Sequence, residues 1–285
     1  MFNRREFIKT IGLTTTGIAG LGGTLFASNF EKKSIFPSVF SPIRIRGRVA
    51  TVGTGLYRVV ISDGKSVATT NSSGEFELNS STDREFVFVS VPAGFEIKKL
   101  ANGSSDFFQK IDKTKADQNL YFDLSKVASS DENHHFLLLS DTQIQNEFEA
   151  NQLLTVAAPD VKRTIQEIND PNIFGIGCGD LVFDRLELFK DYNKSIQHYD
   201  IPFFQVIGNH DMDFGVRSDD WSNQTFKGHF GPTYYSWNRG ELHYVVLDDV
   251  FYLGNSNKYI GNIYIVFWKA IRFIYCLVIL ISMTI

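Results

Sequence analysis

Residues 173–184 read IFGIGCGDLVFD, an apolar run that ends in glycine and is followed by two carboxylates, Asp180 and Asp184. Two other apolar runs also end in polar residues: residues 136–139 before Ser140-Asp141-Thr142-Gln143, and residues 203–207 before Gly208-Asn209-His210-Asp211. Each run is short and apolar enough to form a strand that is covered on both faces. Open α/β sheets bind ligands at the carboxyl ends of such strands. The sequence therefore predicts a polar site at one edge of a sheet.

The residues at these strand ends are suited to a metal ion. Carboxylates from two strand ends and an amide from a third can surround a divalent cation, because oxygen donors suit Mg²⁺, Mn²⁺ and Zn²⁺. Asp180 is placed to bridge a pair of such cations. This pattern predicts a metal site built from three separate segments.

Composition is typical of a folded protein with more than one part. The chain has 285 residues, of which 43% are hydrophobic, and 26 phenylalanines favour a β-rich or mixed architecture. A net charge of −4 gives no broad cationic surface, which argues against nucleic acid as a constitutive partner. Cys178 and Cys276 show no metal or redox spacing, and Cys178 is expected to be a core residue of its strand.

The first 29 residues are interpreted as a targeting segment. Residues 3–9 read NRREFIK and precede a mildly hydrophobic stretch up to Ala27, which resembles a twin-arginine export signal. This resemblance implies an exported protein of the periplasm or cell envelope, with the twin-arginine export machinery as a partner. An uncleaved membrane anchor is the alternative. The segment has no cysteine, which excludes a lipoprotein anchor.

After a linker at residues 30–42, residues 43–125 predict a small β-sandwich. Alternating strands are separated by turn signals every eight to twelve residues, including Ser62-Asp63-Gly64 and residues 71–74, NSSG. Asp63 is interpreted as a turn former. A second linker, residues 126–133, marks the boundary to the next region. No residue of the sandwich points to chemistry, so we expect a spacer or docking module.

Residues 134–261 alternate apolar strands with helical stretches, which predicts an α/β layered fold. Helices are expected at residues 155–168, with Val156, Val161, Ile165 and Ile168 on the buried side, and at residues 186–199. A later strand is expected at residues 242–247. The predicted fold class is therefore α/β, with an N-terminal β-sandwich before a layered α/β domain.

The motifs Gly179-Asp180 with Asp184 and Gly208-Asn209-His210-Asp211, in order after Asp141, resemble the calcineurin-like metallophosphoesterases. Residues 43–125 in turn resemble the carboxypeptidase-regulatory-like domain that precedes the catalytic domain in some exported bacterial members. The resemblance implies hydrolysis of a phosphomonoester or phosphodiester by a metal-activated water. It implies two divalent cations, Mn, Mg, Zn or Fe. The implied ligands are Asp141, Gln143, Asp180 and Asn209.

The same resemblance implies roles for the last motif. His210 would contact the phosphate or protonate the leaving group, and Asp211 would orient His210. Asp184 would be a supporting or structural residue rather than a ligand. These roles are expectations from the family pattern.

This chain departs from the family pattern in two places. Gln143 stands where the family usually has histidine, which favours harder ions such as Mg²⁺ or Mn²⁺. The family also completes its site with an isolated histidine and a Gly-His-x-His segment, whereas only His229 and His243 follow His210 here. The two expected cations would therefore be incompletely ligated in this chain.

The last segment, residues 262–285, contains no acidic residue and is dominated by apolar side chains. Three interpretations are open: a transmembrane helix, a buried terminal helix, or a shift of reading frame near Gly261 that truncates the chain. A transmembrane helix would give contact with a membrane, although Lys269 and Arg272 count against it. Two functions follow: an exported metallophosphoesterase, or a catalytically inactive fragment that acts at most as a binding module.

Overall fold

The computed structural model of the chain describes residues 40–253, 259–260, 263–269 and 276–281. These residues belong to one compact unit, Phe40–Ile285. The expected export segment, residues 1–29, and most of the linker after it lie outside the described residues.

The N-terminal part of the described chain is built almost entirely of strands. They are β1 (Pro42–Thr51), β2 (Thr54–Gly55), β3 (Val60–Ser62), β4 (Val67–Thr69), β5 (Glu75–Ser81), β6 (Phe86–Val89), β7 (Lys98–Lys99), β8 (Ser105–Asp106), β9 (Phe108–Lys110) and β10 (Asp117–Asp123). In one four-stranded sheet β1 pairs with β10, β2 and β5, and another has the order β4-β3-β6-β9. The β-rich character is confirmed, while face-to-face packing as a sandwich remains a prediction.

The turn after β3 forms as expected. Strands β3 and β4 pair antiparallel with Val60 opposite Thr69. Asp63 Oδ1 accepts the backbone N–H groups of Lys65 and Ser66 at 2.9 and 2.6 Å. The predicted role of Asp63 as a turn former is confirmed.

A parallel sheet follows, with helices between its strands. It contains β11 (Phe136–Ser140), β12 (Phe174–Cys178) and β13 (Phe203–Val206) in the order β11-β12-β13. Strands β12 and β13 are buried along their whole length, but the apolar residues of β11 are only half-buried. The three strands are confirmed, and the expectation that both faces of β11 are covered is wrong.

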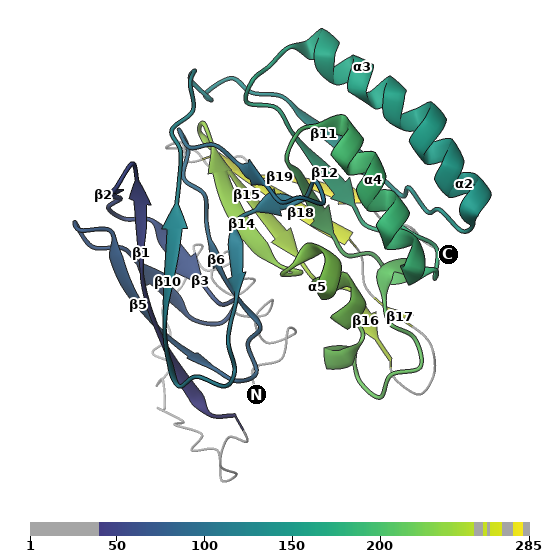
Figure 1. Cartoon of the computed structure of the whole chain (residues 1–285). Helices are drawn as coiled ribbons and strands as arrows, with labels where there is room; N and C mark the ends of the chain where they lie inside the picture. Colours follow the sequence, from purple (N-terminus) through teal and green to yellow (C-terminus); the bar gives the residue numbers. More distant parts are fainter. Residues whose placement is uncertain (1–39, 254–258, 261–262, 270–275, 282–285) are drawn as a thin grey trace, which may run out of the picture. The chain divides into compact units, whose positions relative to one another are not determined.

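Helices connect these strands and lie together on one face of the sheet (Figure 1). They are α2 (Glu147–Gln152), the π-helical turn η1 (Leu153–Ala157), α3 (Ala158–Ile168), the 3₁₀ turn η2 (Leu186–Leu188) and α4 (Phe189–Tyr199). The second predicted helix is confirmed, with Phe189, Tyr192 and Ile196 buried as expected. Glycines of β12 allow this packing, since a Cβ at Gly177 would lie 2.3 Å from the Tyr192 hydroxyl.

The first predicted helix needs correction at its start. Helical structure begins at Glu147 rather than at residue 155, because the side chain of Asn146 caps it by accepting the N–H of Glu149 at 3.0 Å. Val156, expected on the buried side, is 61% exposed, whereas Ile165 is buried. The π-helical turn η1 contains Val156 and breaks the regular α-helical phase on which the prediction depended.

The opposite face of the parallel sheet packs against a second, antiparallel sheet. Phe174 of β12 contacts the rings of Trp237 and Tyr244, and Phe204 of β13 stacks on Trp237 at 3.8 Å between ring centroids. The remaining elements are η3 (Asn209–Asp211), η4 (Asp219–Trp221), α5 (Gln224–Phe230), β14 (Tyr235–Arg239), β15 (Leu242–Leu247), β16 (Phe251–Tyr252), β17 (Tyr259–Ile260), β18 (Ile263–Lys269) and β19 (Cys276–Ile281). The predicted strand at residues 242–247 is confirmed as β15. This part of the chain is therefore a mixed α/β structure, as predicted.

The apolar C-terminal segment contains strands where it is described. Strand β18 pairs antiparallel with β15, and β19 pairs with β18. Both helical interpretations of this segment are wrong for residues 263–269 and 276–281. In the part of the chain that the structure describes, no helix is long and apolar enough to cross a membrane.

The segment predicted as a linker, residues 126–133, is packed against its surroundings. The carboxylate of Asp131 is buried, accepts the N–H of Gly94 at 2.8 Å and lies 3.5 Å from Arg239. Asn172 donates to the carbonyl groups of Ser129 and Ser130. This segment therefore makes contacts with both the β-rich part and the α/β part, unlike a linker without contacts.

Candidate metal centre

The three predicted motifs meet at the carboxyl ends of β11, β12 and β13. The backbone N–H of Asp141 donates to the carbonyl oxygen of Gly179 at 3.3 Å. The backbone N–H of Gln143 donates to the carbonyl oxygen of Asp180 at 2.9 Å. The N–H of His210 donates to Asp180 Oδ1 at 3.1 Å, which joins the third motif to the second. Asp180 is therefore the residue on which all three segments converge.

The side chains of the first two motifs also face one another. The amide of Gln143 donates to Asp180 Oδ2 at 3.2 Å and contacts Asp141 Oδ1 at 3.4 Å. Asp141 in turn accepts a hydrogen bond from the hydroxyl of Ser140. Two carboxylates thus lie on either side of one amide group.

The backbone around these residues is held in an unusual conformation. Asp141, Gln143, Asp180 and Asp184 all have positive φ angles, of 54°, 45°, 47° and 58°. Non-glycine residues rarely adopt this left-handed region, and aspartate is among those that tolerate it best. Such conformations cluster at functional sites, because the surrounding structure must hold them in place. Four of them within two neighbouring loops mark this edge of the sheet as a candidate site.

Gly208 is required for the third motif to approach Asp180. A Cβ at this position would lie 2.1 Å from both the backbone nitrogen and Oδ1 of Asp180. That distance is far below van der Waals contact, so only glycine fits without displacing the loop. Sequence reasoning treated Gly208 as part of a turn and missed this packing role.

The carboxylates at this site repel one another. Burial raises the pKa of Asp180, and the nearby Asp141 carboxylate raises it further. Burial and the charge of Asp180 together raise the pKa of Asp211 to about 7. A bound cation would reduce this repulsion, because it would lie close to the negative charges.

His210 is oriented by a residue other than the expected one. Its Nδ1 lies 2.8 Å from Asp184 Oδ1, and its ring stacks on Phe183 with centroids 3.9 Å apart. The imidazole is buried, whereas the Asp184 side chain is 44% exposed. The expectation that Asp211 orients this ring is therefore corrected, since Asp184 is the carboxylate that contacts Nδ1.

Asp211 instead fixes the backbone of the two loops. Its carboxylate is fully buried and accepts the N–H groups of Val182 at 3.1 Å and Gly208 at 2.9 Å. It is the last residue of η3, where it closes the turn onto the N-terminal glycine. The role that the structure shows for Asp211 is to hold the second motif against the third.

Asn209 lies between Gly208 and His210, and both of these neighbours contact Asp180. Its Nδ2 atom is buried and has no hydrogen-bond partner among the described residues. An amide can present either its oxygen or its nitrogen in that direction, because rotation of the group exchanges the two. Asn209 is thus placed near Asp180 with an unsatisfied polar group, as a ligand to a missing partner would be.

The donor set fits a hard cation in its chemistry. Asp141 and Asp180 offer carboxylate oxygens, and oxygen donors suit Mg²⁺ or Mn²⁺. Gln143 faces these carboxylates with its Nε2 atom, so it, like Asn209, would offer its amide oxygen after rotation of the group. Among the described residues no three His, Cys, Asp or Glu side chains gather closely enough to hold a metal ion. These donors are enough for one cation that keeps several waters, and they leave a second one short of ligands.

The residues that sequence reasoning missed are local supports of the site. Phe183 stacks on the imidazole, and Gly208 admits Asp180. Asp184 was expected to support the site, and the structure identifies the atom that it contacts. An aromatic residue directly before Asp184 was visible in the sequence, but the stacking depends on the fold of two separate loops.

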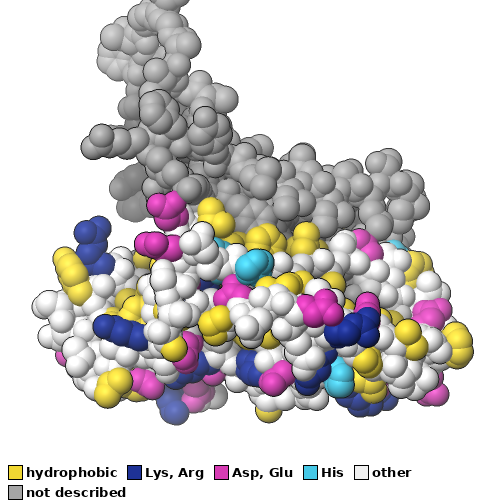
Figure 2. Space-filling view, turned by 90° about the horizontal axis from the view of Figure 1, so that it is seen from above, with side chains coloured by type: hydrophobic (Ala, Val, Ile, Leu, Met, Phe, Trp, Pro, Cys, Tyr) yellow, Lys and Arg dark blue, Asp and Glu magenta, His cyan; other side chains and the backbone are white. Residues whose placement is uncertain are grey.

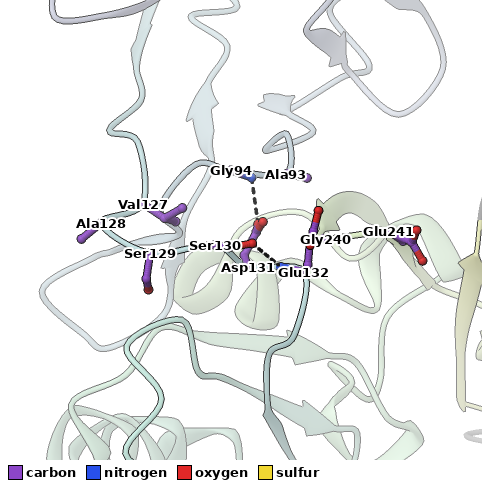
Figure 3. A pocket seen from close by; sticks show the side chains of 10 residues that line it. All are labelled: Ala93, Gly94, Val127, Ala128, Ser129, Ser130, Asp131, Glu132, Gly240 and Glu241. Carbon is purple, nitrogen blue, oxygen red and sulfur yellow. Dashed lines mark hydrogen bonds between the residues drawn. The ribbon is translucent and has the colours of Figure 1, made fainter.

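Two of the cavities among the described residues bear on the candidate site. The larger, of about 480 Å³, is lined by residues of the 126–133 segment with Gly94 and Gly240, away from the strand ends (Figure 3). The carboxylate of Asp131 there accepts a hydrogen bond from the Gly94 N–H, as the dashed line shows. The smaller, of about 380 Å³, is lined by Thr142 together with residues of α2 and η1. Only the smaller cavity adjoins the candidate site.

The surface carries no dominant charge in the view of Figure 2. Lys and Arg side chains are interspersed with Asp and Glu over the described residues of that face. This distribution agrees with the formal net charge of −4.

Comparison with protein families gives one match. Residues 43–127 match the model for the N-terminal region of calcineurin-like phosphoesterase. Comparison with curated proteins and with solved structures gave no match. The matched segment covers the β-rich part and ends before β11, so it does not include the candidate site. Residues 43–127 of the chain are therefore similar to the N-terminal region of calcineurin-like phosphoesterases.

Proposed function

We propose that this protein hydrolyses phosphate esters with a water activated by a bound divalent cation. The observation that carries the proposal is the convergence on Asp180 of Gln143 and His210, from two other segments, at the carboxyl edge of a parallel sheet. The match of residues 43–127 to the N-terminal region of calcineurin-like phosphoesterases supports the same reaction class.

In this proposal Asp141, Asp180, Gln143 and Asn209 hold the cation. Their oxygens favour Mg²⁺ or Mn²⁺, and we propose one firmly held ion rather than the two that the sequence suggested. A divalent cation supplies a nucleophilic water at neutral pH and neutralises charge on the phosphoryl oxygens. The chain itself provides a buried carboxylate, Asp180, and a half-buried one, Asp141, at the strand ends where the cation would hold the ester.

His210 is the proposed proton donor to the leaving oxygen. The Asp184 carboxylate engages Nδ1, so the proton that reaches the leaving group would come from Nε2. Stacking on Phe183 restricts rotation of the ring. The aspartate and the phenylalanine would therefore keep the imidazole in one orientation during turnover.

The test is release of phosphate from 4-nitrophenyl phosphate with Mg²⁺ or Mn²⁺ and with a chelator. We expect activity that depends on the added cation and falls at least about 100-fold in Asp180→Asn. Asp63→Asn is the matched control, since Asp63 is also a buried carboxylate after a strand but satisfies only its own turn. Equal activity in the wild type and Asp180→Asn, with both folded by circular dichroism, would contradict the proposal.

A second candidate function is binding without catalysis. It is favoured by the lack, among the residues that the structure describes, of three His, Cys, Asp or Glu side chains placed around a metal ion. In that case the folded protein would release no phosphate with any of the four expected cations. A glycan, a phospholipid or a partner protein would then be the ligand class to screen.

We also propose an exported location. The support is the paired arginines Arg4 and Arg5 ahead of a mildly hydrophobic stretch. Replacing both with lysine should retain the protein in the cytoplasm of the host cell, which fractionation would measure. Unchanged location in that variant would contradict export by the twin-arginine route.

A further inference from the structure

The cavity beside the first motif is a candidate binding site for part of a substrate. Its volume of about 380 Å³ lies in the range of small-molecule sites, roughly 300–1,000 Å³. Four apolar residues, Ile144, Leu153, Val156 and Ala157, line it together with the polar residues Thr142, Glu149 and Gln152. None of the described residues that line it is Lys or Arg. The cavity therefore suits an uncharged apolar group rather than a second phosphate.

The cavity and the candidate metal centre share the loop after β11. Thr142 lies between Asp141 and Gln143, and consecutive Cα atoms are about 3.8 Å apart. The backbone of both residues is bonded to the loop after β12, by Asp141 to Gly179 and by Gln143 to Asp180. The loop that lines one side of the cavity therefore also carries two of the proposed metal ligands.

The walls of the cavity are held in place. Ile144 is 3% exposed and forms a bridge with Val182, and its carbonyl accepts the N–H of Phe183 at 3.1 Å. Glu149 accepts the backbone N–H of Gln145 and the amide of Asn146, which fixes the start of α2. The carboxylate of Glu149 is therefore engaged in the helix cap.

The π-helical turn η1 forms the outer wall. Val156 within it is 61% exposed although the sequence pattern would bury it. π-Helical turns are rare and occur frequently at functional sites. Here the turn presents a valine side chain to the cavity beside the candidate metal centre, where it can contact a bound group.

We propose that this cavity binds the alkyl or aryl part of the alcohol that leaves from the phosphate ester. The inference rests on the proposed phosphoesterase function and names its substrate class as esters of apolar alcohols. The phosphate would remain at the metal centre while the carbon chain lies against Leu153 and Val156. Esters whose alcohol carries further phosphates would find no cationic partner in the cavity.

The experiment compares ethyl phosphate with hexyl phosphate at saturating Mg²⁺ and at saturating Mn²⁺. Both are primary alkyl esters with chemically alike leaving oxygens, and they differ by four methylenes. We expect kcat/KM to be about tenfold higher for the hexyl ester, as burial of roughly two methylenes would give. Val156→Asp should bring this ratio close to one, mainly by raising KM for the hexyl ester. Val156→Thr, which keeps the side-chain shape, should lower the ratio in part.

Val67→Asp is the matched control, because Val67 of β4 is similarly exposed, at 67%, and does not line the cavity. It should keep the hexyl-to-ethyl ratio near ten. Equal kcat/KM values for the two esters, or a ratio that both Val156 variants leave unchanged, would overturn this inference and leave the proposed function standing. No hydrolysis of either ester or of 4-nitrophenyl phosphate would overturn both.

Discussion

Asp63 and Asp180 are both buried aspartates that follow a strand, but their hydrogen-bond partners differ. Asp63 is 6% exposed, and its Oδ1 accepts N–H groups two and three residues ahead in its own turn. Asp180 is 2% exposed, and its carboxylate accepts from Gln143 and from His210, residues 37 and 30 positions away. A carboxylate whose hydrogen bonds stay within its own turn shapes the chain locally. A carboxylate on which distant segments converge marks a site.

The largest expected effect tests how closely the third motif approaches Asp180. Gly208→Ala would place a Cβ 2.1 Å from Asp180 Oδ1, so the loop must move. We expect a loss of at least about 3 kcal/mol in the free energy of unfolding by urea, together with loss of phosphate release. Gly228→Ala in α5 is the control, because nothing lies within 4 Å of its Cβ. That variant should be neutral or more stable by about 0.5–1 kcal/mol. Equal stabilities of the two variants would contradict the close approach.

The next effect tests the charge repulsion around Asp180. The folded pKa of Asp211 is raised to about 7 from an ordinary 3.8 by burial and by Asp180. Because the folded pKa lies above the unfolded one, this group favours folding most below about pH 4, and the benefit is lost as pH rises through 7. In protein treated with a chelator, the contribution of Asp211 should fall by on the order of 2–3 kcal/mol between pH 4 and pH 8.

Asp211→Asn isolates this contribution. Between pH 4 and pH 8, the free energy of unfolding should decrease less for Asp211→Asn than for the wild type. This comparison holds whatever the absolute stability of the variant. Other carboxyls, such as Asp131, have lowered pKa values and act in the opposite direction, so the difference between the two proteins is the quantity to measure. If the free energy of unfolding of both proteins changed equally with pH, ionisation of Asp211 would not destabilise the folded protein, and the expected effect would be contradicted.

A smaller effect tests the corrected partner of His210. Asp184→Asn removes the charge that faces Nδ1 at 2.8 Å but keeps the shape of the side chain. We expect kcat to fall about tenfold for phenyl phosphate and less for 4-nitrophenyl phosphate, whose leaving group needs less help from an acid. Asp191→Asn, at an ion pair with Lys194 on α4, serves as the control. The same loss for both esters would argue that Asp184 only supports the loop.

The smallest expected effect is at Asp63. Asp63→Asn keeps an oxygen that can accept the N–H groups of Lys65 and Ser66. Stability should change by less than about 1 kcal/mol, and phosphate release should stay at the wild-type level. A loss of activity comparable to that of Asp180→Asn would remove the contrast between the two aspartates.

Much of the strand framework could be predicted because it depends on local pattern. The apolar runs before Asp141, Asp180 and Asn209 became β11, β12 and β13, and their parallel order places the three motifs at one edge. The strand at residues 242–247 was predicted to the residue. Short buried strands carry a strong signal, since a run of apolar residues between polar loops has few other solutions.

The details of the site could not be predicted, because they depend on loop conformation. Asp211 follows His210 in sequence, yet Asp184 contacts its ring, since the left-handed backbone of Asp184 brings it across from another loop. The exposure of Val156 depends on a π-helical turn that no period-3.6 pattern anticipates. The apolar C-terminal segment was ambiguous because strands and buried helices share that composition, and pairing with β15 identifies residues 263–269 as a strand. The shift of reading frame stays a prediction.

The most direct test of the central claim is the binding of Mn²⁺ measured by calorimetric titration of the wild type, Asp180→Asn and Asp63→Asn. The account predicts one Mn²⁺ per wild-type chain, retained in Asp63→Asn and lost or weakened at least about tenfold in Asp180→Asn. Binding that Asp180→Asn leaves unchanged, or no binding by the folded wild type, would contradict a metal centre at the carboxyl ends of β11, β12 and β13.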